Sequence, residues 1–356
     1  KDIGLSEWEQ YLARPRLPEL TNMQFEDFLR FWRCGTKNTD NMGTRTEKGA
    51  TREKRLARLI RKRLARALPP AADSRSAAVK RVRAVERVPQ VGDQLVGLRP
   101  YLRDIHRLYQ KTEGLKHASA SYMSKQTDIN AKMRAALIDW LVEVHSEFKL
   151  VAETLYLTVS LIDRFLEREQ IPKNKLQLVG VTAMFIASKY EEVSPPACSQ
   201  IVSVSHELYS REEILRMEQL ILSTLSFELT SPSAFVFFCS FATVAGMATA
   251  PRSTTELLAN YLIELTLQED RMRVYLPSLL CAAAIWLALK TRGELPWSAA
   301  LAQHSTYTEA DLQPCVRDLH GLHCEAASSR LQAVYMKYAR WECRSVSCIK
   351  AVCAAQ

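Results

Sequence analysis

The chain has 356 residues, of which 47% are hydrophobic, and its 48 Lys and Arg outnumber 39 Asp and Glu to give a formal net charge of +9. This composition is typical of a globular protein and leaves room for a sizeable core. No uncharged apolar run reaches the roughly 18 residues that a membrane-spanning helix requires, so we expect a soluble chain. Nine cysteines, odd in number and widely scattered, argue against a disulfide framework and favour a reducing compartment.

The basic excess lies entirely in the first quarter of the sequence. Residues 1–97 hold 21 of the Lys and Arg and 12 of the Asp and Glu, which leaves 27 of each for residues 98–356. The first segment is polar over long stretches and cannot bury enough apolar area to offset the entropy of ordering. Residues 1–97 are therefore predicted to be a mostly disordered tail.

Within this tail, residues 52–66 hold eight basic side chains and one Glu, with aliphatic residues spaced as a single helical stripe. Two interpretations remain open for this basic stretch: a nuclear-import signal, or the solvated face of a transient helix. Direct binding to nucleic acid is disfavoured because no aromatic residues are interleaved for stacking on bases.

Beyond the tail, the apolar residues recur at helical spacing. Residues 130–149 carry them at steps of three and four, which predicts a helix with one apolar face. Further helices are predicted over 155–165 and over 176–190, the latter rich in small residues and packed on several sides. Ser210 and Glu213 form a capping box that opens the next helix.

The same order of helices recurs after Pro232, with similar lengths. The predicted elements are an apolar helix over 235–244, a helix capped by Ser253 and Glu256, a small-residue helix over 277–289, a short element near Trp297 and a helix opened by Thr308 and Asp311. No strand is predicted. The repeat indicates an all-α fold of two stacked bundles of about five helices each.

Five motifs occur in the order and spacing of one known family. They are residues 133–143 (MRAALIDWLVE), 161–166 (LIDRFL), 175–180 (KLQLVG), 187–192 (ASKYEE, followed by two prolines) and 216–218 (RME). Together they resemble the cyclin box, and the resemblance covers about residues 98–340. Residues 122–130 are similar to A- and B-type mitotic cyclins, and residues 264–269 and 331–338 look most like the B-three branch.

The resemblance implies two consecutive five-helix cyclin boxes, with a preceding N-terminal helix. Residues 98–228 would form the first box with its leading helix, residues 229–340 the second box, and residues 341–356 a C-terminal tail. Such a protein is not an enzyme and needs no cofactor. It binds and activates a cyclin-dependent kinase, recruits substrates and controls G2/M, mitotic or meiotic progression, and catalysis stays in the kinase.

By this resemblance, Lys189 and Glu218 form the polar centre of the contact with the kinase. The alternative is an internal ion pair that locks two helices of the box, and residue chemistry alone favours that alternative. Tyr190 stands where the family commonly has Phe, so its hydroxyl needs a partner or solvent. The apolar surround that the resemblance implies consists of Ile105, Ile186, Tyr190, Leu222 and Phe227.

Two further sets of residues match the family in the first box. Arg134 and Asp163 correspond to its internal ion pair and are expected to be structural. A shallow groove that docks Arg-x-Leu motifs of substrates is implied for Met133, Leu137, Trp140, Glu143 and Gln177. Four of these share one helix face, and the commoner fate of such a face is burial in the core. Ala136 stands where the family has a larger aliphatic residue, which predicts weaker docking.

The tail also holds a segment that resembles a destruction box, which an anaphase-promoting ubiquitin ligase recognises. Its key positions are Arg14, Leu17, Leu20 and Asn22. The resemblance therefore implies timed destruction of the protein. Together with the basic stretch, it also implies a nuclear protein that exchanges with the cytoplasm.

A cyclin-box transcription factor that contacts DNA and polymerase is the alternative from another class. It requires a basic ordered core and an N-terminal zinc ribbon, whereas the core is neutral and Cys34 is the only cysteine before residue 198. His320, His323 and Cys324 lie close together in sequence, but no CxxC pair completes a four-ligand set, so no metal is expected. No glycine-rich phosphate-binding loop is present either.

Overall fold

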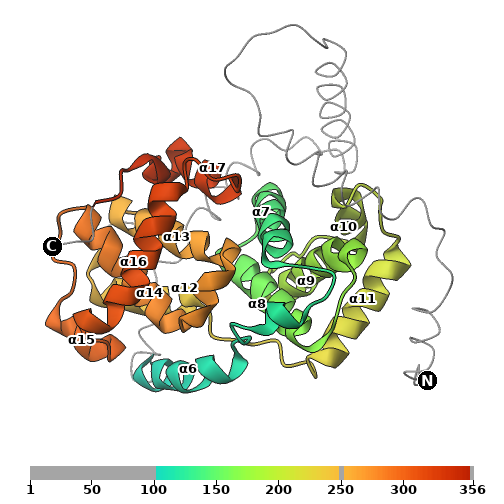
Figure 1. Ribbon diagram of the computed structural model, residues 1–356, viewed down its shortest axis with the longest axis horizontal. Coiled ribbons are helices and arrows are strands. Elements are labelled where there is room, and N and C mark those ends of the chain that lie inside the picture. Colours follow the sequence, from blue (N-terminus) through green and yellow to red (C-terminus); the bar gives the residue numbers. More distant parts are fainter. Residues whose placement is uncertain (1–101, 248–251, 353–356) are drawn as a thin grey trace, which may run out of the picture. The chain divides into compact units, whose positions relative to one another are not determined.

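The computed structural model describes residues 102–247 and 252–352, which are helical wherever they are regular (Figure 1). The predicted destruction box and basic stretch lie outside the described residues. Helix α6, which precedes the first bundle, spans Leu102–Lys116. The first bundle consists of α7 (Ala131–Phe148), α8 (Ala152–Arg168), α9 (Leu176–Glu191), α10 (Cys198–Val204) and α11 (Arg211–Thr224).

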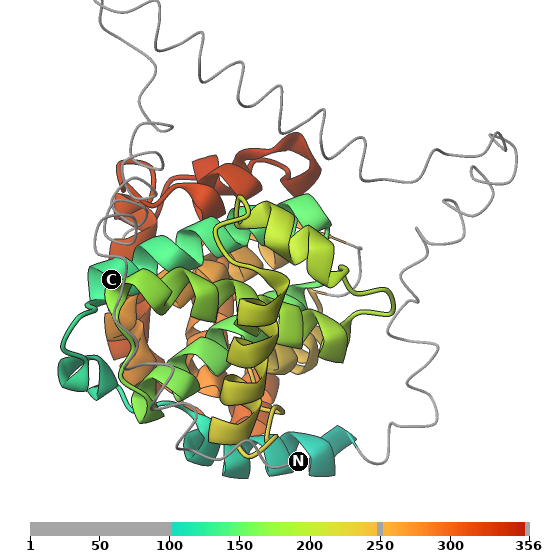
Figure 2. The same cartoon turned by 90° about the vertical axis from the view of Figure 1, so that its right-hand side faces the viewer.

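The second bundle repeats this order. It consists of α12 (Ala234–Val244), α13 (Thr254–Gln268), α14 (Pro277–Thr291), α15 (Ala299–Ser305) and α16 (Glu309–Glu325), and α17 (Ala333–Ala339) follows it. In Figure 2 the first bundle faces the viewer, with α11 in front of α8 and α9. The prediction of an all-α fold with two consecutive five-helix bundles is confirmed, and the described residues contain no strand.

Each bundle is built around one helix that is apolar on nearly all sides. In α9 every residue from Leu176 to Ser188 is buried, and α14 is buried from Pro277 to Leu289 except at one position. The small residues in these helices let neighbouring helices approach closely. A Cβ atom added at Gly180 would lie only 2.7 Å from Cδ1 of Leu137 on α7.

Gly180→Ala is therefore expected to destabilise the fold by about 1–3 kcal/mol, because the fully buried Leu137 has no free space to move into. Gly321→Ala on α16 is the matched control, since an added Cβ there meets nothing within 4 Å. That control should stabilise by about 0.5–1 kcal/mol through better helix propensity. Urea unfolding of the two variants measures the difference, and equal effects would contradict the close packing of α7 on α9.

The helix starts follow the predicted capping residues. The hydroxyl of Ser210 accepts a hydrogen bond from the backbone N–H of Glu213, and the Glu213 carboxylate accepts one from the backbone N–H of Ser210. Thr308 and Asp311 form the same two hydrogen bonds at the start of α16. Ser253 caps α13 by accepting from the backbone N–H of Glu256. Side-chain oxygens thus satisfy backbone donors that have no partner inside the helix.

Helix α7 differs from its predicted form. The spacing predicted one apolar face, yet ten of its residues are buried, including Arg134 and Asp139. The reason is that α7 packs on helices of both bundles, α9 and α13, and also on α17. Its polar side chains therefore form buried contacts between the two bundles. The Arg134 Nη1 donates to the carbonyl oxygen of Leu267 at 3.0 Å, at the end of α13.

Asp139 joins three helices from the middle of α7. Its Oδ1 accepts hydrogen bonds from the side-chain amide of Gln268 on α13 and, at 2.9 Å, from the backbone N–H of Ala333 at the start of α17. Its other oxygen is buried without a hydrogen-bond partner among the described residues. Burial raises the pKa of Asp139 to about 7, despite the hydrogen bonds that lower it.

This raised pKa predicts a pH-dependent stability. A carboxyl whose pKa is higher in the folded state binds its proton more tightly there. Its contribution to the free energy of unfolding is therefore complete below the ordinary pKa of 3.8 and is lost as the pH rises through about 7. The stability of the wild type relative to Asp139→Asn should therefore fall between about pH 4 and pH 7 and change little at higher pH. Urea unfolding at several pH values measures this, and parallel curves for the two proteins would contradict it.

Candidate functional site

Lys189 near the end of α9 and Glu218 on α11 form an ion pair in which Lys189 Nζ donates to Glu218 Oε1. The two side chains differ in exposure: 41% for Lys189 and 12% for Glu218. The ammonium group also lies 4.2 Å from the centre of the Phe185 ring. The structure thus brings the two predicted charges together, and the pair connects two helices while Lys189 remains accessible to a partner.

Aromatic side chains flank this pair. Tyr190 is exposed, and its hydroxyl lies 2.7 Å from Oγ1 of Thr230, so the hydroxyl has both a partner and solvent. Phe227 is 70% exposed on the turn that follows α11. In that turn Ser226 and Phe227 both have positive φ angles, 53° and 58°, which non-glycine residues adopt at a cost. The turn holds the Phe227 ring away from the core, whereas Leu222 is half-buried beside the bundle.

The structure adds two apolar residues that the sequence analysis did not include. Val193 is fully exposed just after α9, and Leu215 is exposed on α11. Leu215, Glu218 and Leu222 are spaced i, i+3 and i+7, so they share one helix face. That spacing was the available signal in the sequence.

One residue of the predicted contact is placed differently. Ile186 is buried in the core of the first bundle, because α9 is covered on nearly all sides, so it offers no surface to a partner. Ile105 lies in the first turn of α6 and is half-buried. We use the name exposed patch for Lys189, Tyr190, Val193, Leu215, Glu218, Leu222 and Phe227.

The second predicted pair is deeply buried between α7 and α8. Arg134 donates two hydrogen bonds of 2.6 Å to the two carboxylate oxygens of Asp163, and Tyr122 donates to the same carboxylate at 2.7 Å. Burial alone would raise the pKa of Asp163, but the Arg134 guanidinium and these hydrogen bonds lower it. Arg273 lies over the Tyr122 ring, 4.1 Å from its centre.

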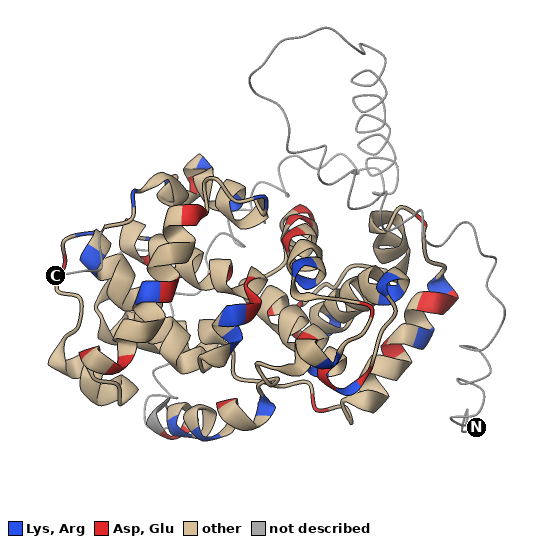
Figure 3. Cartoon of the chain, viewed as in Figure 1, with Lys and Arg blue, Asp and Glu red and all other residues tan. Residues whose placement is uncertain are grey.

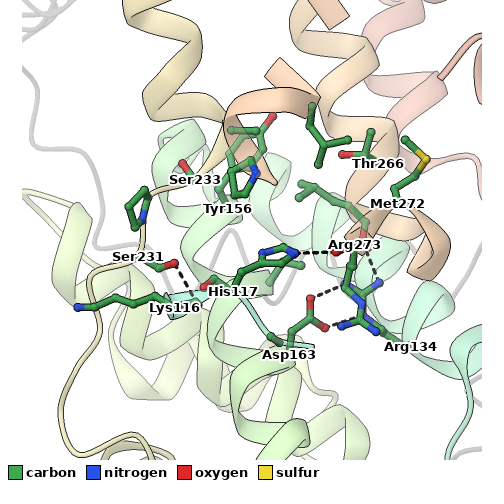
Figure 4. A pocket seen from close by; sticks show the side chains of 18 residues that line it. Lys116, His117, Arg134, Tyr156, Asp163, Ser231, Ser233, Thr266, Met272 and Arg273 are labelled. Carbon is green, nitrogen blue, oxygen red and sulfur yellow. Dashed lines mark hydrogen bonds and ion pairs between the residues drawn. The ribbon is translucent and has the colours of Figure 1, made fainter. Parts of the chain in front are cut away.

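Figure 4 shows Arg134 and Asp163 facing each other at the edge of a pocket of about 90 Å³. Its lining comes from both bundles and includes Tyr156 on α8 and Met272 after α13. The His117 ring lies across it, with Nε2 2.9 Å from the carbonyl oxygen of Arg273. Arg134 and Asp163 pair with each other, whereas Lys116 and Arg273 pair with Glu228 and Asp270 outside the lining. The charged side chains of the lining thus have partners within the fold, which fits a structural role for the ion pair.

The predicted docking groove on α7 is largely closed. Leu137, Trp140 and Gln177 are buried, and α9 packs directly against Leu137. Only Met133, which is half-buried, and Glu143, which is exposed, reach the surface. The core interpretation of this face is therefore correct for Leu137. Figure 3 shows acidic residues gathered at one end of α7.

The histidine and cysteine side chains on α16 do not converge. Cys324 Sγ lies 3.7 Å from Nε2 of His320 on the surface, whereas His323 is buried with its ring edge against Tyr261. Within the part of the chain that the structure describes, no three His, Cys, Asp or Glu side chains are arranged to hold a metal ion. No helix of this part is both long enough and apolar enough to cross a bilayer.

Comparison with known proteins gives the family of this fold and site. Residues 104–230 match the cyclin N-terminal domain, and residues 232–351 match the cyclin C-terminal domain. The chain belongs to the cyclin family. The viral cyclin of herpesvirus saimiri has a similar structure, with a TM-score of 0.56 and 22% sequence identity, over 61% of this chain and 96% of the viral chain.

The relatives by sequence carry mitotic names. The G2/mitotic-specific cyclin-A of Hydra viridissima is 42% identical over 67% of this chain and 56% of its own length. Cyclin-B2-1 of Oryza sativa subsp. japonica is 42% identical over 68% of this chain and 57% of its own length. The G2/mitotic-specific cyclin-2 of Medicago sativa is 42% identical over 67% of this chain and 72% of its own length. The chain thus spans little more than half the length of the first two relatives.

These findings confirm the predicted resemblance to mitotic cyclins of the A and B groups. Assignment to the B-three branch stays a prediction.

Proposed function

We propose that this cyclin is a regulatory subunit that binds and activates a cyclin-dependent kinase and performs no catalysis itself. The observation that supports this most is the exposed patch, in which apolar side chains surround an accessible Lys189–Glu218 pair. Exposed aromatic and aliphatic side chains gathered in one patch are typical of a protein interface. The patch would bind a mobile helix of the kinase and hold it in the active arrangement.

The test is direct. The full chain is added to a purified, monomeric cyclin-dependent kinase, and phosphorylation of histone is followed. Activation that saturates with the concentration of the cyclin supports the proposal. Kinase activity that stays at its monomeric level, with several such kinases and a folded chain, would refute it.

Recruitment of Arg-x-Leu substrates is a finer part of the proposal. Because Leu137 and Gln177 are buried and Ala136 is small, the α7 face offers mainly Met133 and Glu143 to such a peptide. The exposed carboxylate of Glu143 is suited to the Arg of the motif. We expect docking at this face to be weak, since little apolar area is available for the Leu.

Destruction through the tail is also proposed, together with a nuclear location that the basic stretch 52–66 supports. Arg14→Ala combined with Leu17→Ala is expected to prolong the lifetime of the protein at mitotic exit, because the ubiquitin ligase would lose two key contacts. The half-life in a mitotic extract measures this effect. Arg61→Ala with Leu64→Ala, a bare Arg-x-x-Leu elsewhere in the tail, is the matched control. A double variant at Arg14 and Leu17 that disappears as fast as the wild type would contradict the assignment.

A further inference from the structure

The segment after α17 exposes a large aromatic ring. Trp341 is 82% exposed at the start of the short helix η5 (Trp341–Cys343), whereas Trp140 and Trp286 are buried. Met336, on α17, is exposed as well. The Trp341 ring leaves in water the apolar area that the buried tryptophans remove from it, and this area is available to a partner.

The backbone around Trp341 is firmly held. Cys343 and Val346 on either side of the turn are buried in the core of the second bundle. Arg344 and Ser345 have positive φ angles of 52° and 49°, and the backbone N–H of Ser345 donates to the carbonyl oxygen of Arg340 at 3.1 Å. This tight turn, with two non-glycine residues in a costly conformation, fixes the backbone that carries Trp341. A partner would therefore not have to order this backbone on binding.

The segment that carries the ring is basic. Residues 330–352 contain five Lys and Arg and one acid, Glu342, whereas the chain from residue 98 onward is neutral overall. Lys337 is neutralised by Glu264 at 2.7 Å. Arg340 and Arg344 are exposed, and neither guanidinium has an ion pair or hydrogen bond among the described residues. Figure 3 shows basic residues on and after α17.

We propose that Met336, Arg340, Trp341 and Arg344 form a docking surface for an acidic protein segment, rich in Asp and Glu, that carries an aromatic or aliphatic anchor. Trp and Arg are the residues that most often dominate binding energy at interfaces. The anchor packs on the indole ring, and the carboxylates of the segment pair with the two free guanidinium groups. A second copy of this chain fits less well, because two such surfaces would bring four arginines together.

The surface is separate from the exposed patch, so this inference does not depend on the proposed kinase partner. The probe is a short fluorescein-labelled peptide with Asp and Glu on both sides of a single Phe, titrated with the full chain and followed by anisotropy. Trp341→Ala is expected to weaken binding by about tenfold or more, as is the charge reversal Arg340→Glu with Arg344→Glu. Leu295→Ala, which removes an exposed apolar side chain elsewhere, should leave the affinity unchanged.

Further measurements test the apolar anchor and the acidic residues of the peptide separately. A peptide with Phe replaced by Ala, and one with Asn and Gln in place of the acids, should both bind at least several-fold more weakly. Added salt should weaken wild-type binding more than that of the Arg340→Gln, Arg344→Gln variant. All variants should keep the wild-type melting temperature, and Trp341→Ala should activate the kinase as the wild type does.

Several results would overturn the inference. They are no binding of the acidic peptide by the folded wild type, unchanged binding by Trp341→Ala, equal binding of the uncharged peptide, or binding that appears only when the peptide carries phosphoserine. Dimerisation of the free chain that Trp341→Ala abolishes, seen by sedimentation, would instead assign the surface to a second copy.

Discussion

Replacing both Lys189 and Glu218 by alanine is expected to weaken kinase binding about thirtyfold to a thousandfold. The pair joins α9, where the exposed Tyr190 follows Lys189 directly, to α11, after which the exposed Phe227 lies. Truncating a central contact that a partner desolvates costs about 2–4 kcal/mol. Each 1.4 kcal/mol corresponds to about tenfold in the dissociation constant.

The stability of the fold should change little in this double variant. The Lys189 side chain is 41% exposed, and ion pairs in contact with solvent contribute only about 0–1 kcal/mol. Removing both members leaves no charge without its partner. The melting temperature should therefore stay close to that of the wild type, which separates a loss of binding from a loss of structure.

A charge swap makes the test sharper. Lys189→Glu with Glu218→Lys keeps an ion pair between α9 and α11 but reverses the charges that a partner meets. If the pair contacts the kinase, titration of the swapped protein should show the same large loss of affinity or a greater one. Wild-type affinity of the swapped protein would mean that the pair only connects two helices, as its geometry in the free chain also permits.

Arg134→Met is expected to destabilise the protein by about 3–5 kcal/mol, because it leaves the buried Asp163 carboxylate without its cation. Two charge-assisted hydrogen bonds of 2.6 Å are lost, as is the bond from Arg134 to the carbonyl oxygen of Leu267. One hydrogen bond of 2.7 Å from Tyr122 and the nearby positive charge of Arg273 would remain to stabilise the carboxylate. Urea unfolding, monitored by circular dichroism, measures the loss.

The double variant Arg134→Met, Asp163→Leu is the control, since replacing a whole buried pair by apolar side chains is far less damaging than breaking it. The pH dependence adds a second check. The pKa of Asp163 is lower in the folded state than in the unfolded chain. Its contribution to the free energy of unfolding is therefore present above the ordinary pKa of 3.8 and is lost as the pH falls through the lowered pKa. An Arg134→Met protein as stable as the wild type at neutral pH would contradict the structural role.

Helix positions and starts were predictable because they depend on local chemistry. The capping boxes at Ser210 and Thr308 satisfy backbone donors of their own helices, so they can be recognised from four residues of sequence. The small-residue helix around Gly180 was likewise recognisable as central. Short elements without such signals, α10 and α17, were not predicted.

The site was less predictable because exposure is decided by packing between helices distant in sequence. The resemblance predicts Leu137 in a docking groove and Ile186 in the contact with the kinase, yet both are buried. Asp139 lies off the apolar stripe of α7, and only the docking of α13 and α17 makes it a buried link. Val193 follows the end of a helix, where periodicity gives no information about exposure.

The polar links of α7 to α13 and α17 also limit how the protein can be divided. A fragment that ends after the first bundle would leave the Arg134 Nη1 without the Leu267 carbonyl and Asp139 without both of its hydrogen-bond donors. Unsatisfied buried polar groups of this kind cost free energy, so the isolated first bundle should be less stable than it is within the whole chain. The same bonds couple the sequences of the two bundles: a change of Arg134 or Asp139 on α7 leaves polar groups of the second bundle without partners unless those groups change as well.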